Sequence, residues 1–150
     1  MIGVISDTHG WLRPQAIEAL RGCDLILHAG DVGEAAVLDE LRRIARVVAV
    51  RGNVDVEPWA RRLPATEIVE AGTKTFYILH RIADLELKPS AAGVDAVIFG
   101  HSHQPDIAWR DGVLFFNPGS AGPRRFRLPV TLGRIEVKDG ELRPEIVPLL

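Results

Sequence analysis

Two histidines separated by one serine follow an apolar segment in DAVIFGHSHQP, residues 95–105. A similar pair occurs near the N-terminus, where the apolar IGVIS is followed by Asp7 and His9. Residues i and i+2 of an extended segment point to the same side, so each pair can converge on one small target. Imidazole and carboxylate groups placed in this way are typical metal ligands, and His101 and His103 therefore indicate a metal-binding region.

Three further apolar segments also end in polar corners, at Gly30-Asp31, at Gly52-Asn53 and at His80. Together the five corners supply seven candidate ligands: Asp7, His9, Asp31, Asn53, His80, His101 and His103. Gathering so many polar groups without a ligand would carry a large desolvation cost. Seven ligands suit two ions that share a bridging carboxylate, and the donor set favours Mn, Fe, Zn, Co or Ni over Ca or Mg.

The elements expected to position these corners alternate between strands and helices in the first half of the chain. We predict strands at 2–6, 24–30 and 46–50, with helices at 14–21 and 34–45. Continuous apolar strands joined by helices indicate a parallel sheet covered on both faces. The carboxyl ends of such strands meet at one edge of the sheet, where ligands bind.

The second half of the chain changes to hairpins around one more apolar strand, residues 95–99. The predicted hairpins span 66–80 (turn at Ala71-Gly72), 106–117 (turn at Asp111-Gly112) and 130–149 (turn at Asp139-Gly140). Asp-Gly pairs are strong signals for tight hairpin turns. The sum is an α/β fold with mixed sheets and helices outside, and residues 1–150 suit a single domain.

Composition narrows the class of protein. A net charge of -2 gives no basic excess to indicate nucleic acid as an electrostatic partner. The single cysteine, Cys23, excludes an internal disulfide and fits a reducing compartment. No segment of membrane-spanning length is found, so we expect a cytoplasmic protein without a membrane partner. The late edge strands are compatible with a homodimer.

The ordered motifs resemble the calcineurin-like metallophosphoesterase superfamily, and they run over about two-thirds of the chain: Asp7-x-His9, Gly30-Asp31, Gly52-Asn53, His80 and Gly100-His101-Ser102-His103. The chain length and the form Gly52-Asn53-x-Asp55 are similar to its small single-domain bacterial and archaeal phosphodiesterase subgroup. The resemblance implies a four-layer α-β-β-α sandwich of two mixed β-sheets flanked by helices, with the metals at the strand ends.

The resemblance also implies a role for each ligand. One metal would be held by Asp7, His9 and His103, and the other by Asn53, His80 and His101. Asp31 would bridge the two ions, and Asn53 would also orient a phosphate oxygen of the substrate. The implied enzyme is a metal-dependent phosphoesterase that hydrolyses small phosphodiesters, and monoesters as well, by attack of a metal-held hydroxide. Manganese is the expected metal, with Fe, Zn, Co or Ni as alternatives.

Two positions depart from the family pattern. Val54 stands where many members have a histidine, so the proton for the leaving group must come from elsewhere, which favours reactive leaving groups such as aryl oxides. Arg81 follows His80 where the family usually has glycine, and it is either a phosphate clamp or a solvated residue. The segment 82–94 is shorter than the helix that the family often has there, which predicts a trimmed or open substrate pocket.

Four other features lie outside the ligand set. His28 is expected to bond to a backbone partner, or to support the ligands from behind, and residues 117–120 are expected to support the site. Trp11 either lines the entrance of the site or packs in the core. A basic cluster, expected to be a solvated surface run although it could attract anionic substrates, consists of Arg124, Arg125 and Arg127.

The main alternative function is a non-catalytic scaffold or protein-binding module, because the same fold occurs in a retromer scaffold subunit. Ligand positions would be expected to decay in such a protein. All seven ligand types are present in this chain, which favours an enzyme.

Overall fold

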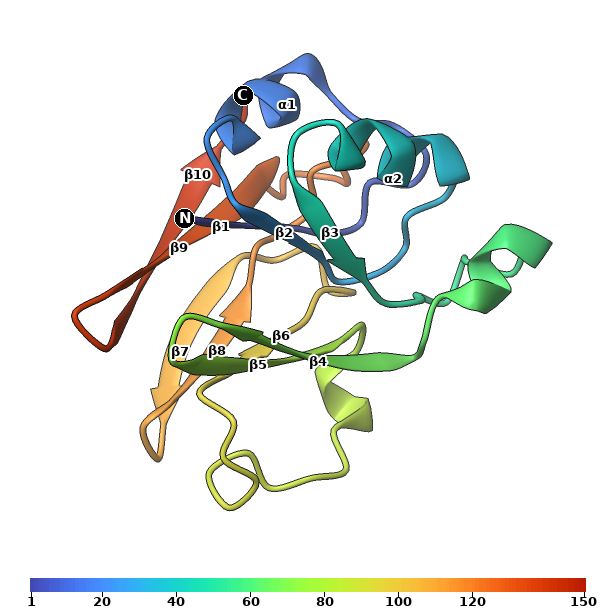
Figure 1. The fold of residues 1–150 in the computed structure, drawn as a ribbon. Helices are drawn as coiled ribbons and strands as arrows, with labels where there is room; N and C mark the ends of the chain where they lie inside the picture. The colour runs from blue at the N-terminus through green and yellow to red at the C-terminus, as the bar shows by residue number, and fades with distance from the viewer.

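A computed structural model describes residues 1–150 as two five-stranded sheets packed face to face (Figure 1). The first sheet has the order β10-β9-β1-β2-β3 and contains β1 (Ile2–Ile5), β2 (Leu25–His28), β3 (Arg46–Ala49), β9 (Thr131–Lys138) and β10 (Glu141–Pro148). The second has the order β4-β5-β6-β8-β7 and contains β4 (Thr66–Ala71), β5 (Lys74–Leu79), β6 (Ala96–Ile98), β7 (Asp106–Arg110) and β8 (Val113–Asn117). Both sheets mix parallel and antiparallel pairs, which confirms the predicted α/β sandwich.

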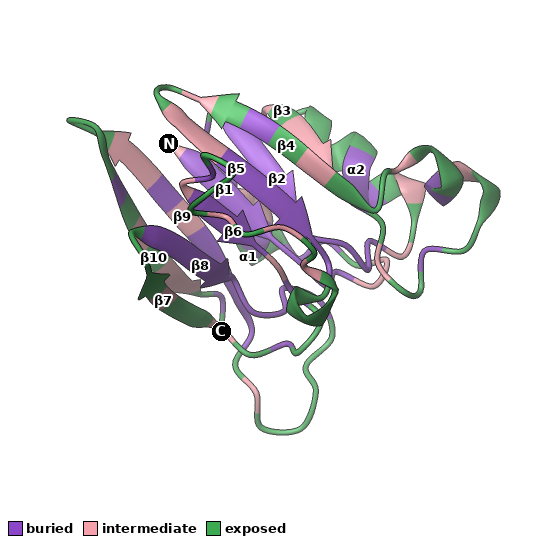
Figure 2. Cartoon of the chain, turned by 90° about the horizontal axis from the view of Figure 1, so that it is seen from below, coloured by how far each residue is buried: buried purple, intermediate pink, exposed green.

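The hairpin turns follow their residue types. Asp111-Gly112 and Asp139-Gly140 both have positive φ at both residues, as a type I′ turn requires. The turn between β4 and β5 lies one residue later than predicted, because Ala71 still pairs with Lys74. The buried core between the sheets includes large side chains from both, such as Phe76 and Phe116. Along the second sheet β8 is buried over its whole length, whereas the edge strand β7 is largely exposed (Figure 2).

Two short helices, α1 (Pro14–Leu20) and α2 (Ala35–Arg42), cover the outer face of the first sheet. Leu20 and Leu41 are fully buried in the core cluster beneath them. The second helix ends three residues before the predicted position 45, because the N–H of Ile44 bonds to Leu41 three residues back and tightens the chain into a turn. No helix has the length and apolar character needed to cross a bilayer.

The outer face of the second sheet is covered by the connection between β5 and β6. That connection contains a single short 3-10 helix, η2 (Ile82–Asp84), and a loop. Leu85 and Leu87 of this loop pack against the cluster that includes Tyr77 and Leu79. The outer layer on this face is therefore a loop with one helical turn, in the segment 82–94 that is shorter than the helix the family often has there.

Candidate metal centre

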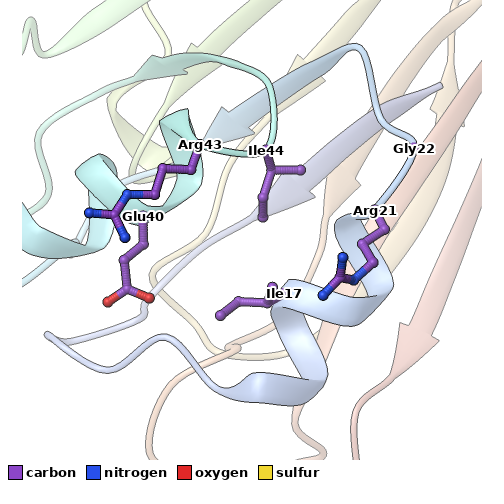
Figure 3. A pocket seen from close by; sticks show the side chains of 6 residues that line it. All are labelled: Ile17, Arg21, Gly22, Glu40, Arg43 and Ile44. Atoms are coloured by element: carbon purple, nitrogen blue, oxygen red, sulfur yellow. The ribbon is translucent and has the colours of Figure 1, made fainter.

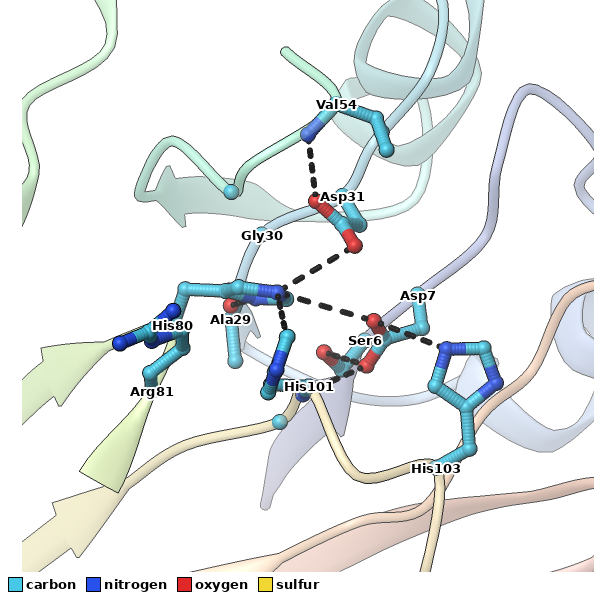
Figure 4. Close-up of polar contacts among 12 residues, drawn as sticks. Ser6, Asp7, Ala29, Gly30, Asp31, Val54, His80, Arg81, His101 and His103 are labelled. Atoms are coloured by element: carbon cyan, nitrogen blue, oxygen red, sulfur yellow. Dashed lines mark hydrogen bonds and ion pairs between the residues drawn. The ribbon is translucent and has the colours of Figure 1, made fainter. Parts of the chain in front are cut away.

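Six of the seven predicted ligands lie together at the carboxyl ends of the central strands. Figure 4 labels all of them except His9. They form two groups, and within each the ligand atoms all lie within 4.8 Å of one another. The first group is Asp7, His9 and His103, and the second is Asp31, His80 and His101. The seventh residue, Asn53, is exposed on the loop that follows β3. Its neighbour Val54 contacts the second group directly, because its N–H donates to Oδ1 of Asp31 at 3.0 Å.

The backbone that presents these side chains is left-handed, not extended. Positive φ angles, from 48° to 72°, occur at five of the six grouped residues: Asp7, His9, Asp31, His101 and His103. The expectation of an extended backbone is therefore wrong. Asp7 and His9 still converge in one group, whereas His101 and His103 fall in different groups. Such backbone is unfavourable for residues other than glycine and persists where the surroundings enforce it, as at functional sites.

Asp7 connects the two groups and has one oxygen without a partner. Its Oδ2 accepts hydrogen bonds from the hydroxyl of Ser6 at 2.6 Å and the N–H of His101 at 3.2 Å. Its Oδ1 is buried without a hydrogen bond, 3.4 Å from Nε2 of His103 and 3.8 Å from Nε2 of His9. Nε2 of His9 is also buried without a partner. Buried polar atoms normally have partners, so these orphaned atoms fit a bound cation.

His80 presents a bare nitrogen to the second group. Its Nδ1–H donates to the carbonyl of Ala29 at 2.7 Å, which leaves Nε2 as the lone-pair nitrogen. That Nε2 lies 3.3 Å from Oδ2 of Asp31 and 3.3 Å from Nδ1 of His101. Three ligand atoms thus point at one another (Figure 4), an arrangement that requires either a proton or a metal ion between them.

The same contacts shift the pKa values of His80 and Asp31. Burial tends to lower the pKa of His80, but the hydrogen bond with Asp31 and the charge of Asp7 raise it above its ordinary value. Burial likewise opposes ionisation of Asp31, yet hydrogen bonds from the protonated form of the His80 ring and from the Val54 N–H lower the pKa of Asp31 to about 2. The carboxylate is therefore ionised at neutral pH and available to a cation.

The sequence profile of the calcineurin-like phosphoesterase superfamily domain matches residues 1–140 of this chain. The chain belongs to this superfamily. It is 36% identical to the probable metallophosphoesterase MJ0623 of Methanocaldococcus jannaschii, over 99% of this chain and 81% of that protein. An archaeal phosphodiesterase of known structure shares the fold with a TM-score of 0.81 and 27% identity, covering 97% of this chain and 99% of that one. The Vps29 structure from Chaetomium thermophilum superimposes with a TM-score of 0.78 over 97% of this chain and 94% of that one, at 22% identity, a likeness of fold.

Asp55 braces two loops of this calcineurin-like centre, a role that the sequence analysis missed. The residue is 2% exposed, and its carboxylate accepts hydrogen bonds from three backbone N–H groups, of Val32, Gly33 and Gly52, at 3.1, 3.0 and 2.9 Å. Val32 and Gly33 follow Asp31 on one loop, and Gly52 precedes Asn53 on the other. The only available signal was the aspartate two residues after Asn53, which carried a family likeness but no role.

His28 joins the loop that follows β1 to the loop that follows β2. The Gly30 N–H donates to its Nδ1 at 3.1 Å, so Nε2 carries the proton and donates it to Oγ1 of Thr8 at 3.0 Å. The Thr8 hydroxyl in turn donates to the carbonyl of Val32 at 2.8 Å. The predicted backbone partner of His28 is confirmed, and the ring also contacts Thr8, between Asp7 and His9.

We expect His28 to make the metal-free protein acid-sensitive. Complete burial lowers the pKa of His28 to about 4 from an ordinary 6.5. The unfolded chain then binds a proton that the folded chain does not, so stability falls as pH drops from 6.5 to 4, by about 3 kcal/mol in all. Urea denaturation in EDTA should show this slope, and the variant His28→Gln should lack it.

Comparing wild type with His28→Gln separates the effect of His28 on stability from that of His80. The raised pKa of His80 has the opposite sign, because its contribution is present below 6.5 and is lost as pH rises. Both proteins retain His80, so its effect cancels in the difference. Parallel pH profiles for wild type and His28→Gln would contradict the assignment of a buried, neutral His28.

The loop that carries His101 and His103 rests on Asn117, as expected for residues 117–120. The Asn117 side chain is buried and donates to the carbonyl of Gly100 and the hydroxyl of Ser102, both at 3.1 Å. Gly100 must be glycine, because a Cβ there would collide with Oγ of Ser6 and lie 2.7 Å from Oδ2 of Asp7. The loop therefore packs directly against the aspartate of the first group.

Arg81 and Trp11 both lie at the surface of the protein. Arg81 is exposed and pairs with Asp84, with 3.3 Å between Nε and Oδ2, at a cavity of about 350 Å³ that His80 also lines. Its side chain is therefore exposed and held by an ion pair in this structure. Trp11 is 46% exposed, which excludes a place in the core.

A separate hollow of about 510 Å³ lies between α1 and α2 (Figure 3). It is lined by Ile17, Arg21, Gly22, Glu40, Arg43 and Ile44. None of these is a candidate ligand, and Arg21 already pairs with Glu18 at 2.7 Å. No polar side chain that lines the hollow is buried, so the hollow has none of the buried ligand atoms that characterise the metal centre.

Proposed function

We propose that this chain is a dinuclear phosphodiesterase that binds two divalent transition-metal ions, with manganese as the expected metal. The observation that carries the proposal is the pair of adjacent three-residue groups with buried ligand atoms that lack partners. Asp31 is the proposed bridge, because its Oδ2 lies 3.3 Å from Nε2 of His80 in one group and 3.8 Å from Nε2 of His9 in the other.

Each residue has a proposed task in the hydrolysis of a phosphodiester. Two ions at these groups would polarise the phosphoryl oxygens and lower the pKa of a water molecule. Asp31 would hold its carboxylate between the groups, fixed by the Val54 N–H. Asn53, exposed beside that contact, would add to the metal ligands and hold a phosphate oxygen through its amide. Arg81 would contact the substrate only after releasing Asp84.

The proposed substrates are small diesters with reactive leaving groups. Hydrolysis adds water across one P–O bond and gives a monoester and an alcohol, so the departing oxygen must take up a proton or leave as an anion. Val54 places an aliphatic side chain beside Asp31, and 46% of its surface is exposed. An aryl oxide leaves without prior protonation, and an alkoxide does not. Aryl phosphodiesters should therefore be cleaved fastest, with monoesters as secondary substrates.

The test is turnover of bis(p-nitrophenyl) phosphate at neutral pH. We expect release of p-nitrophenolate that requires added Mn²⁺, stops with EDTA and returns when excess metal is restored. The metal content of the protein is measured in parallel. Failure to cleave with Mn, Fe, Zn, Co or Ni although two ions are bound would contradict the proposal, and would favour a protein-binding scaffold on the same fold.

A cytoplasmic location is part of the proposal. Cys23 is a free, buried cysteine, and burial raises the pKa of its thiol above the ordinary value. The protein thus has no disulfide and no exposed thiolate, which suits a reducing compartment.

A further inference from the structure

The connection between β8 and β9 places an exposed aromatic ring among arginines beside the metal centre. Phe126 is 91% exposed, and it stands in a run with three exposed arginines: Arg124, Arg125 and Arg127. None of these arginines forms an ion pair with an acidic side chain. We call residues 123–128 the arginine loop.

The base of the arginine loop is fixed to the strand end that carries Asp7. The Ala121 N–H donates to the carbonyl of Ser6, and the Ser120 hydroxyl donates to the carbonyl of Asp7, both at 3.1 Å. A Cβ on Gly122 would collide with the carbonyl oxygens of Asp7 and Thr8. Figure 1 shows this orange connection passing beside the segment that follows β1. The arginine loop therefore leaves the fold directly beside the first ligand group.

The tip of the arginine loop holds the Phe126 ring outward. The Leu128 N–H donates to the carbonyl of Arg125 at 3.1 Å and closes a turn around Phe126, whose φ is 53°. The left-handed region is an outlier for a bulky residue. Because four residues of chain span at most about 14 Å, the Cα of Phe126 stays within that distance of the Cα of Gly122.

A second aromatic ring lies on the same side of the centre. Trp11 follows His9 by two residues, and the guanidinium of Arg13 lies 4.0 Å from its ring centre. Arg13 also donates to the carbonyl of Gly122 at 3.1 Å, so it ties Trp11 to the base of the arginine loop. Exposed aromatic rings interleaved with arginines suit a ligand that has both flat faces and negative charge.

We propose that the arginine loop recognises the nucleoside part of a nucleotide-bearing phosphodiester. A base would stack on Phe126, and the arginines would attract the phosphate that the metal centre cleaves. This inference rests on the proposed phosphodiesterase function and names its substrate class. The net charge of -2 gave no hint of it, because it sums 18 basic and 20 acidic residues over the whole chain and does not report three arginines on one loop.

The test compares two esters that release the same p-nitrophenolate: thymidine 5′-(p-nitrophenyl phosphate) and methyl p-nitrophenyl phosphate, each with Mn²⁺. We expect wild type to prefer the thymidine ester in kcat/KM. Phe126→Ala should lower that preference about tenfold, the loss expected for one base–aromatic stack. Phe126→Tyr should retain it. The matched control is Trp109→Ala, an exposed aromatic residue on the edge strand β7, which should leave both rates unchanged.

The possible failures are distinct. Cleavage of both esters without a preference that depends on Phe126 would overturn this inference and leave the proposed function standing. Cleavage of neither ester would refute the phosphodiesterase function, and the inference would fall with it. The role of the arginines in attracting the phosphate is tested by the double variant Arg124→Gln and Arg125→Gln. This variant should raise KM for the thymidine ester about tenfold, and an unchanged KM would contradict that role.

Discussion

Replacing Asp31 with alanine should remove both metal ions and lower kcat/KM for bis(p-nitrophenyl) phosphate more than about 100-fold, beyond the usual effect of residues that only orient ligands. The Asp31 carboxylate faces His80 in one group and His9 in the other, at 3.3 and 3.8 Å. Its loss therefore takes a negative ligand from both groups at once. Metal content by mass spectrometry and steady-state kinetics on the purified variant give the measurement.

Two further variants test whether the loss of both metal ions is particular to Asp31. His103 belongs to the first group alone, with its Nε2 3.4 Å from Oδ1 of Asp7, so His103→Ala should lose metal mainly from that group. Asp39 is an exposed carboxylate on α2 paired with Arg42, so Asp39→Ala should change neither metal content nor rate. Retention of two ions by Asp31→Ala would refute the bridge, and equal loss of both ions from His103→Ala would show that the groups are not separate.

The sequence predicts that the candidate ligands lie close together, because residues that follow neighbouring parallel strands meet at one edge of the sheet. His80 follows β5 and His101 follows β6, and the parallel pairing of these strands brings Nε2 of His80 within 3.3 Å of Nδ1 of His101. Asp7 and Asp31 follow β1 and β2 in the same way. Apolar runs that end in polar corners carry this information without any knowledge of side-chain geometry.

The backbone conformation at the ligands could not be found in that way. Left-handed φ at His101 depends on contacts with distant residues, including the bond from its N–H to Asp7 and the packing of Gly100 against Ser6. Residue type and spacing do not report such contacts. For the hairpins, in contrast, Asp-Gly pairs encode positive φ locally, and the turns at Asp111 and Asp139 lie where predicted.

Asp55 shows the other limit of sequence reasoning, because its role depends on backbone groups from two loops about 20 positions apart in the chain. Backbone N–H donors are present at nearly every residue, so no pattern of side chains distinguishes the ones that are left without a partner. The fold brings three of them to one carboxylate. Replacing Asp55 should therefore have a large effect on stability, although its side chain contacts neither ligand group.

We expect Asp55→Ala to lower the free energy of unfolding by about 3–5 kcal/mol, since each buried N–H left unpaired costs about 1–3 kcal/mol. The corresponding loss of melting temperature is about 10 °C for a chain of this size. The matched control is Asp95→Ala, because Asp95 accepts a single backbone hydrogen bond, from Thr75 at 2.8 Å, and is more exposed. That variant should lose about 1 kcal/mol. Thermal and urea unfolding of the metal-free proteins provide both values.

Asp55→Ala also distinguishes a role in positioning the two ligand loops from a role in overall stability. Val32 and Gly33 follow Asp31, and Gly52 precedes Asn53, so release of their N–H groups should loosen both loops while the sheets stay folded. At 10 °C, where Asp55→Ala remains folded, metal affinity should fall 10–100-fold, the range known for residues that orient ligands. Wild-type affinity in a folded but less stable Asp55→Ala protein would mean that the carboxylate holds the fold together without positioning the ligands.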